Sequence, residues 1–194
     1  MRIELALLRA VALARSPEPI LNAEGLVGVN VVSTPGRLLI AAGTRHRFFF
    51  ASMVQAPNTE TGTWTLHPGT VHDLCSDPSE FAKLDMGGRS FITPANLGGR
   101  VDLIATPFPN WRKIVPDSFV AGGVHNDVLC VDGRFVELLV QAHRLIIPED
   151  VTPTIRIRQH KAGEYVAAIP GVPAFGAILA GMKQDTPVYI PGVQ

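Results

Sequence analysis

Residues 26–54 read LVGVNVVSTPGRLLIAAGTRHRFFFASMV, and this stretch decides the fold. β-Branched and aromatic residues dominate it, as is typical of strands on a pleated, half-buried surface. The sequence predicts strands over residues 26–33, 37–42 and 45–54, with a turn at Thr-Pro-Gly 34–36 between the first two. Strands joined by such short connections pair in antiparallel fashion.

A helix is predicted before this stretch, over residues 3–14, where apolar residues recur at spacings of three and four. Arg2 and Arg9 lie seven residues apart, so we expect them on one face of that helix. The Ser-Pro-Glu-Pro at residues 16–19 ends the helix, because proline cannot continue it.

The same alternation of helix and strands recurs further along the chain. After residue 54 the sequence predicts strands at 64–66, 81–86, 89–93, 100–106, 127–131, 154–159, 165–169, 174–181 and 187–191, with helices at 68–76 and 133–146. Three units of about 50–70 residues follow from element lengths in the usual range. They predict an α+β fold in which helices cover one side of antiparallel sheet. We expect residues 1–108 to form a domain of two units, 109–126 a connector, and 127–194 a half domain.

Composition limits the classes of function that the chain can have. Hydrophobic residues make up 46% and charged residues 18% of the chain, so a folded protein is expected. The formal net charge is +0, which leaves only local basic patches to argue for nucleic-acid binding. Cys75 and Cys130 have no metal-ligand spacing and are expected to be reduced thiols. No stretch is long enough to span a membrane, so we expect a soluble, cytoplasmic protein without a membrane partner.

Catalytic constellations are absent from the sequence. It contains no GxSxG, Walker, HExxH or GxGxxG motif, and its six histidines are scattered over different predicted elements. His67 and His72 are close, but a pair without a third ligand is weak evidence for a metal site. The sequence therefore predicts a protein that is not an enzyme and needs no cofactor or metal.

Three segments of the sequence stand out, namely IAAGTRHRFFF at 40–50, FPNWRKIVP at 108–116 and PVYIPGVQ at 187–194. They resemble the bacterial DNA polymerase III β sliding clamp family. The first matches a His-Arg-Leu in the clamp's middle domain, although Arg45 stands where the family has glycine. The second matches the connector before the clamp's last domain and is the most specific of the three. The third matches the valine-rich end of the clamp chain.

The resemblance implies two sites. In the family these segments meet in space and form a pocket for polymerase and repair-protein peptides. Here that implies a peptide site formed by Leu21, His46, Arg47, Phe48, Pro109, Lys113, Ile114, Val188 and Ile190. Family helices line a channel and contact DNA phosphates without sequence preference. This implies DNA contacts from Arg2, Arg9 and Arg15 at the first helix and Arg134 and Arg144 on the third; His143 is a further candidate.

The implied function is that of a processivity factor which encircles double-stranded DNA and binds DNA polymerase and clamp-loader peptides. The resemblance covers the clamp's middle domain and about half of its last domain, without the first. A clamp ring in the family holds twelve helix-plus-sheet units. With three units per chain, a closed homo-oligomer needs four copies; a further unit within residues 116–132 would reduce this to three.

Two other functions remain open on the sequence. A clamp-like adaptor or decoy would keep the peptide pocket without encircling DNA. An unrelated α+β structural or binding protein is the other alternative, because residues 170–182 have no clear counterpart in the family.

Overall fold

The structure is a computed structural model, and it describes residues 1–17, 24–44, 46–95, 98–110, 131–150, 152–161 and 164–180. Its elements in chain order are β1 (Arg2–Glu4), α1 (Leu5–Ala12), the 3-10 helix η1 (Glu24–Val27), β2 (Val29–Thr34), β3 (Arg37–Gly43), β4 (Arg47–Val54), β5 (Gly62–Leu66), α2 (Pro68–Ser76), β6 (Phe81–Asp85), β7 (Ser90–Ile92), β8 (Gly98–Arg100), α3 (Gly133–Ile146), β9 (Arg156–Lys161), β10 (Glu164–Ala168) and β11 (Phe175–Ala180). None of the described helices is long and apolar enough to cross a membrane.

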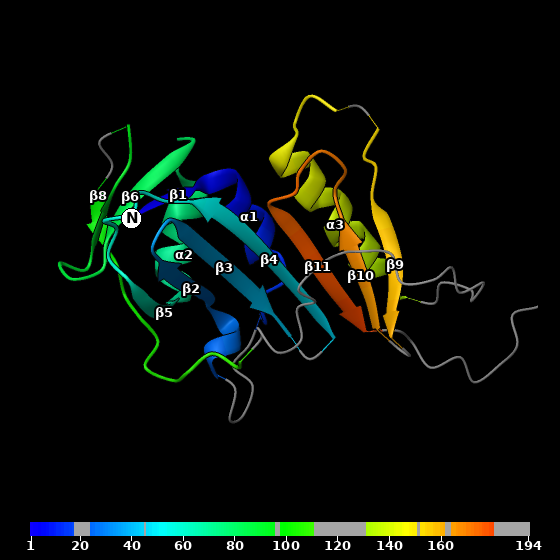
Figure 1. The fold of residues 1–194 in the computed structure, drawn as a ribbon, viewed down its shortest axis with the longest axis horizontal. Coiled ribbons are helices and arrows are strands. Elements are labelled where there is room, and N and C mark those ends of the chain that lie inside the picture. The colour runs from blue at the N-terminus through cyan, green and yellow to red at the C-terminus, as the bar shows by residue number, and fades with distance from the viewer. Residues whose placement is uncertain are drawn as a thin grey trace, which may run out of the picture.

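One supersecondary pattern repeats along the chain (Figure 1). The first unit is β1-α1-β2-β3-β4 and the second is β5-α2-β6-β7-β8, so each is a strand, a helix and three strands. The third unit is α3-β9-β10-β11, a helix followed by three strands. The predicted α+β class and the three helix-plus-strand units are therefore confirmed for the described part of the chain.

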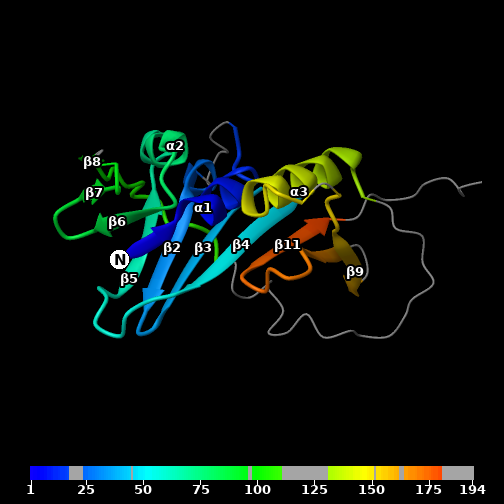
Figure 2. The same ribbon diagram turned by 90° about the horizontal axis from the view of Figure 1, so that it is seen from above.

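The strands form two antiparallel sheets, whose orders are β1-β6-β7-β8 and β5-β2-β3-β4-β11-β10-β9. In the larger sheet β4 of the first unit pairs with β11 of the third, with Phe48 opposite Ile178. One seven-stranded sheet therefore runs through both units. Figure 2 shows the helices α2, α1 and α3 in a row along one side of this sheet. We call that side the helix face and the opposite side the outer face.

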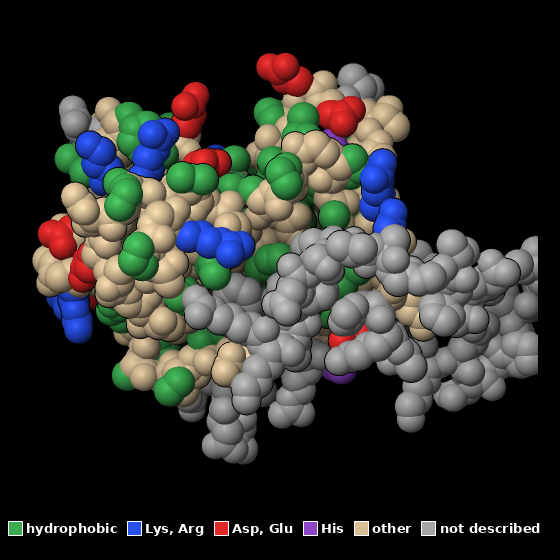
Figure 3. Space-filling model, in the orientation of Figure 1, with side chains coloured by type: hydrophobic (Ala, Val, Ile, Leu, Met, Phe, Trp, Pro, Cys, Tyr) green, Lys and Arg blue, Asp and Glu red, His purple; other side chains and the backbone are tan. Residues whose placement is uncertain are grey.

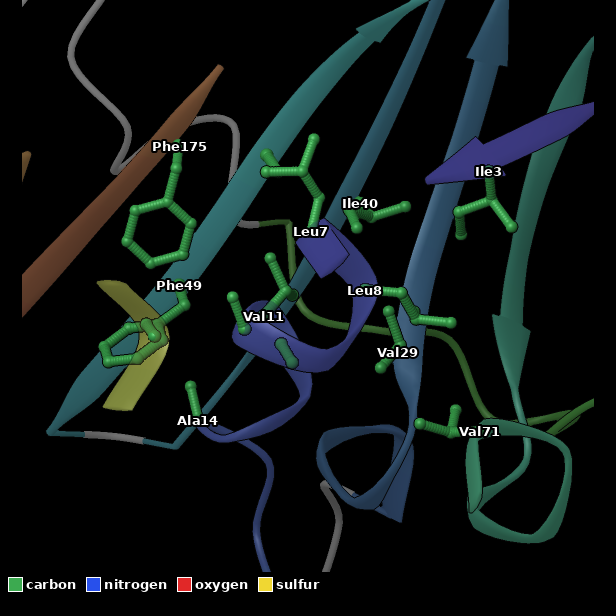
Figure 4. Close-up of a cluster of buried hydrophobic side chains, with 14 of the residues drawn as sticks. Ile3, Leu7, Leu8, Val11, Ala14, Val29, Ile40, Phe49, Val71 and Phe175 are labelled. Carbon is green, nitrogen blue, oxygen red and sulfur yellow. The ribbon is translucent and has the colours of Figure 1, made fainter. Parts of the chain in front are cut away.

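Helix α1 fills the centre of the core. Its residues Leu8 and Val11 are fully buried and lie among side chains of the sheet strands (Figure 4). Phe49 of β4 and Phe175 next to it on β11 meet edge to face, with ring centroids 5.6 Å apart. Burying each such large apolar side chain contributes about 1.5–3 kcal/mol, so this layer holds the first and third units together.

The hairpin between β2 and β3 forms as the sequence predicts. Thr34 and Arg37 are the last paired residues of the two strands, and the turn passes through Gly36. Gly36 has a φ of +76°, a conformation that a side chain disfavours, so glycine suits this position. Its carbonyl accepts a hydrogen bond from the backbone N–H of Gln55, 3.0 Å away, which ties the turn to the end of β4.

Three of the predicted elements are clearly wrong in their bounds. The predicted strand over 26–33 starts later, because Glu24–Val27 is the 3-10 helix η1 and β2 is Val29–Thr34. The predicted helix over 3–14 is a strand over Arg2–Glu4 followed by α1, because Ile3 pairs with Ala82 of β6. Pairing with a distant strand outweighs the local apolar spacing that favoured helix. Arg2 and Arg9 consequently lie on different elements and do not share a helix face.

The predicted strand over 100–106 is also wrong. The strand is β8 (Gly98–Arg100), so the glycines that were expected to separate strands belong to one. Beyond it, Leu103 forms only an isolated bridge with Leu66. The predicted strand at 187–191, and that at 127–131 except for Val131, lie outside the described residues. So does the predicted connector from residue 111 onward, and the proposed boundaries at 109 and 127 remain predictions.

Candidate functional site

The turn between β3 and β4 places the His-Arg-Phe segment at one end of the large sheet. The Thr44 hydroxyl accepts hydrogen bonds from the backbone N–H groups of His46 and Arg47, at 3.2 and 3.3 Å. The His46 carbonyl accepts one from the backbone N–H of Ala180 at 2.8 Å, so the start of β4 is fixed to the end of β11. His46 itself is exposed.

Phe48 lies in a small apolar cluster on the outer face. Successive strand residues point to opposite sides of a sheet, so Phe48 faces away from the helices while Phe49 faces them. The cluster, called the outer-face cluster below, consists of Ala41, Phe48, Val166 and Ile178, with Leu39, Phe50 and Phe108 packed at its edge. The rings of Phe48 and Phe108 are 6.1 Å apart and tilted by 58°. Pro109 follows Phe108 and is exposed. The beginning of the FPNWRKIVP segment thus lies against Phe48.

A shallow hollow of about 100 Å³ opens beside Phe48. Its lining residues are Thr44, His46, Arg47, Phe48, Glu164, Ile178 and Ala180. Ligand pockets usually enclose about 300–1,000 Å³, so the described walls form only a shallow part of such a site. Of the predicted peptide-site residues, His46, Arg47 and Phe48 line the hollow and Pro109 lies next to Phe108. Leu21, Lys113, Ile114, Val188 and Ile190 lie outside the described residues.

Arg47 lines the hollow, but its guanidinium is on the helix face. It donates a hydrogen bond to the carbonyl of Arg15 at 3.3 Å, and it lies 5.8 Å from the ring centroid of Phe135 on α3. Burial lowers the pKa of Arg47, the nearby Arg134 lowers it further, and Asp132 opposes this shift. Arg47 therefore connects α1 with α3, which differs from the rim position that the sequence predicts.

Arg9 on α1 is engaged inside the protein. Its guanidinium donates to the carbonyls of Cys75 (3.0 Å) and Ser79 (3.4 Å) and also to that of Asp77. The last carbonyls of a helix lack partners within the helix and attract cations. Arg9 therefore holds the C-terminal end of α2 against α1, and few of its donors remain for a DNA phosphate.

The other two arginines near the first helix lie apart from each other. Arg2 is on β1 and stacks over the ring of Phe81, 3.9 Å from its centroid. Arg15 follows α1, is half-buried, and donates to the carbonyl of Ala12 at 3.2 Å. Arg47 binds the Arg15 carbonyl and also lies beside Phe135 of α3, so Arg15 is near the start of α3. Arg15 is therefore better placed than Arg2 for a contact on the helix face.

Arg134 stands at the start of α3 beside an acidic partner. Asp132 caps the helix by accepting from the Arg134 backbone N–H at 2.9 Å, and its carboxylate pairs with the Arg134 guanidinium at 2.5 Å. The hydrogen bonds from Arg134 lower the pKa of Asp132, and the Asp132 carboxylate raises the pKa of Arg134. The Arg134 side chain is 85% exposed, so it is accessible although its charge is partly neutralised.

The end of α3 carries an exposed Arg144 and a buried His143. Among the described residues no ion pair is formed by Arg144. His143 is 1% exposed, and its Nε2 lies 3.3 Å from the Asp150 carboxylate. The structure thus brings Arg15, Arg47 and Arg134 together at the junction of α1 and α3, leaves Arg144 apart at the other end of α3, and excludes His143 from the surface. On the outer face, Figure 3 shows Lys and Arg side chains at separate positions rather than in one patch.

Sequence reasoning missed the contribution of β10 and β11 to the hollow. Glu164, Ile178 and Ala180 line it, because Ile178 is opposite Phe48 in the β4–β11 pairing. Residues 174–181 are a recognisable strand, but nothing in the sequence indicates which strand is its neighbour. A charged residue directly before a predicted strand, as Glu164 is before the strand at 165–169, was the one available signal. No group of three or more His, Cys, Asp or Glu residues that could hold a metal occurs within the described ranges.

Comparison with known proteins identifies the fold. No family model matches the sequence, and no curated protein matches it. The structure is similar to the DNA polymerase III β subunit of Thermotoga maritima, with a TM-score of 0.67 and 12% identity over 95% of this chain and 65% of that one. The sliding clamp of Pseudomonas aeruginosa gives 0.64 and 10% over 95% and 66%, and that of Caulobacter crescentus gives 0.62 and 14% over 95% and 66%. The chain thus has the fold of bacterial sliding clamps and spans about two thirds of their length.

Proposed function

We propose that this chain is a clamp-like processivity factor that encircles double-stranded DNA as a closed homo-oligomer. In this proposal it catalyses no reaction, acts in the cytoplasm, and binds peptides of DNA polymerases and clamp loaders at the hollow beside Phe48. The observation that carries the proposal is the layered fold: three helices along one face of an antiparallel sheet, superimposable on bacterial sliding clamps over 95% of the chain.

The layered arrangement supports enclosure of DNA. A sheet continues from the first unit into the third, with the helices on its other side (Figure 2). In a closed ring with this sheet outermost, the exposed side chains of the helices would face the DNA. Arg15, Arg134 and Arg144 are the side chains that we assign to phosphate contacts. Each phosphate contact steepens the dependence of log affinity on log salt by about 0.9. Few contacts per copy therefore imply weak binding with a shallow salt dependence for each copy, which suits a ring that slides.

The outer-face cluster supports peptide binding. Short extended peptides bind where an apolar concavity offers a few polar groups at its rim. Phe48 and Ile178 provide the apolar floor, and His46 and Glu164 provide polar groups. We assign the apolar anchor of the peptide to the floor, and a backbone N–H of the peptide to the Glu164 carboxylate.

Retention on circular DNA tests enclosure. The protein, loaded on a nicked circular plasmid, is expected to stay bound through gel filtration at a salt concentration that removes it from linear DNA. Cutting the plasmid once should release it, since a ring slides off a free end. Equal retention on circular and linear DNA would contradict enclosure and would indicate ordinary phosphate binding.

An adaptor that binds peptides without encircling DNA is the second candidate. The observation in its favour is the sparse charge of the helix face. Arg9 is held by carbonyls at the end of α2, and α2 itself contains no Lys or Arg in PGTVHDLCS. Binding of a clamp-motif peptide by a protein that shows no retention on circular DNA would select this candidate.

A further inference from the structure

The outer face of the large sheet carries a second hollow besides the one at Phe48. It encloses about 150 Å³, and Arg156 and Arg158 of β9 line it together with Val166 and Ala168 of β10. Both arginines are exposed. We call this site the arginine hollow; the function proposed above gives it no role.

Strand pairing connects the two hollows across the sheet. β4, β11, β10 and β9 are neighbours in that order (Figure 1). Phe48 pairs with Ile178 of β11, and Ile178 pairs with Val166 of β10. Val166 in turn pairs with Arg158 of β9. Directly paired residues lie on one face, so these four form a row across the outer face. Neighbouring strands are about 4.8 Å apart, so the row spans roughly 14 Å.

The fold does not use the charges of the two arginines. Arg156 and Arg158 are two residues apart on β9 and share a face, while Ile157 between them packs against the core on the helix face. Their partners on β10 are Ala168 and Val166, which carry no charge. Among the described residues neither arginine forms an ion pair. Two like charges therefore stand side by side, available to an anionic group from outside the chain.

The two hollows share β10 as a wall but differ in charge. Glu164 at the start of β10 lines the hollow beside Phe48, whereas Val166 and Ala168 further along line the arginine hollow. Glu164 pairs with Lys161 rather than with either arginine. A ligand that fills both hollows consequently needs an apolar group at Phe48 and an anionic group at β9.

We propose that the arginine hollow binds an acidic side chain of the same peptide whose apolar anchor occupies the hollow beside Phe48. This assignment rests on the peptide site of the proposed function and adds a sequence preference to it. An extended peptide advances about 3.3 Å per residue, so roughly four residues cover the row from Phe48 to Arg158. Residues four apart in an extended chain project to the same side. Arginine binds carboxylates through two parallel hydrogen bonds, which favours Glu or Asp at that position.

Two fluorescein-labelled peptides test the proposal on the 194-residue chain. Both carry Leu and Phe anchors. One has glutamate four positions before and four positions after the anchors, and its neutral twin has glutamine at both. Fluorescence anisotropy is expected to show that the wild type binds the acidic peptide about three- to tenfold more tightly, the range for exposed, charge-assisted pairs. This preference should disappear near 1 M salt, where screening acts within about 3 Å.

Substitution of the arginines locates the preference. Arg156→Gln combined with Arg158→Gln should bring the two peptides to the same affinity. Arg37→Gln is the matched control, because Arg37 is an exposed arginine on the same face but pairs with Val54, at the opposite end of β3 and β4 from Phe48. Reversal of both charges (Arg156→Glu with Arg158→Glu) should make a peptide with lysine at the two positions bind better than the acidic one. A purely structural role for the arginines would not produce this reversal.

The outcomes separate this proposal from the function on which it rests. Equal affinity of the wild type for the acidic and neutral peptides would overturn the proposal alone, whereas binding of neither peptide would overturn the peptide site as well. A preference that survives in the glutamine double variant would also overturn it; if that variant loses retention on circular DNA instead, the arginines contact phosphates. Should the double variant not fold, Arg158→Gln alone is expected to reduce the preference, and an unchanged preference would count against the proposal.

Discussion

The first two units and the third unit share one pattern but differ in how they are completed. β1 and β5 are exchanged between the first two units, so the strand after each helix has neighbours on both sides. β9 of the third unit has a neighbour on one side among the described residues, and the unit is attached to the rest through β4, β11 and the α1–α3 contact. Among the described residues, the same local sequence pattern thus gives a strand after the helix that is paired on both sides in the first two units and on one side in the third.

The attachment of the third unit depends on a small number of large side chains. Phe49 and Phe175 form an aromatic pair from two units, and Arg47 connects β4 with Phe135 and with the end of α1. These contacts lie on the helix face, while the outer-face cluster lies on the opposite side of the same strands. The contacts that attach the third unit and the candidate peptide site thus share β4 and β11, and Arg47 belongs to both because it also lines the hollow.

The largest expected effect is on the aromatic pair between units. Phe49→Ala should lower the free energy of unfolding by about 3–5 kcal/mol, because it leaves a cavity in the core. A double-mutant cycle with Phe175→Ala should give a coupling of about 0.5–1.5 kcal/mol for the ring contact. Urea denaturation measures both. Val54→Ala, at an exposed position of the same strand, is the control; equal losses at positions 49 and 54 would contradict the coupling of the units.

The next largest effect on stability is expected at Arg9, which connects α1 of the first unit with the end of α2 of the second. Arg9→Met should cost about 1.5–3 kcal/mol of stability, since it removes charge-assisted hydrogen bonds to carbonyls at the end of α2. Urea denaturation measures this loss. Arg15→Met is the matched control, because the Arg15 side chain donates to one carbonyl, that of Ala12. If stability is unchanged and the salt dependence of DNA binding becomes shallower, Arg9 is a DNA contact and the structural role assigned to it is wrong.

A smaller effect is expected at the hollow, where the third unit meets the first. His46→Ala should weaken binding of a fluorescent peptide with Leu and Phe anchors by about 0.5–1.5 kcal/mol, the usual worth of one hydrogen bond. Fluorescence anisotropy gives the affinity. His72→Ala removes another exposed histidine, on α2, and should not change it. Equal weakening by the two variants would place the peptide elsewhere.

The smallest effect is expected on the acid dependence of stability. It involves two carboxylates, that of Asp77 at the end of α2 and that of Asp132 at the start of α3. Hydrogen bonds from Ser79 lower the pKa of Asp77, and those from Arg134 lower the pKa of Asp132. Each carboxylate therefore stabilises the fold above the unfolded pKa of about 3.9, and this contribution is lost as pH falls through the lower folded value. Asp77→Asn and Asp132→Asn should each flatten the decline of melting temperature below about pH 4. A decline as steep as that of the wild type would show that the carboxylates contribute little.

The resemblance to a known family, rather than local physics, made part of the candidate site readable from the sequence. The His46-Arg47-Phe48 segment and the Pro109 segment were recognised separately, and the structure brings Phe48 and Phe108 into contact. The side of the sheet on which Arg47 lies was not readable, because one residue of register moves a side chain to the other face. Nor was the role of Arg9, whose carbonyl partners are 66 to 70 residues away.

The sequence by itself determined the α+β class, the number of helix-plus-strand units in the described chain, and most strand positions, because residue periodicity and turn chemistry act over a few neighbours. Tertiary structure alone decided that Ile3 is in a strand, that β5 covers β2, and that β11 joins β4 to create the hollow. These choices depend on pairing between strands far apart in the chain, where many partners are compatible with the same local pattern. Only the common burial of the side chains around α1 selects among them.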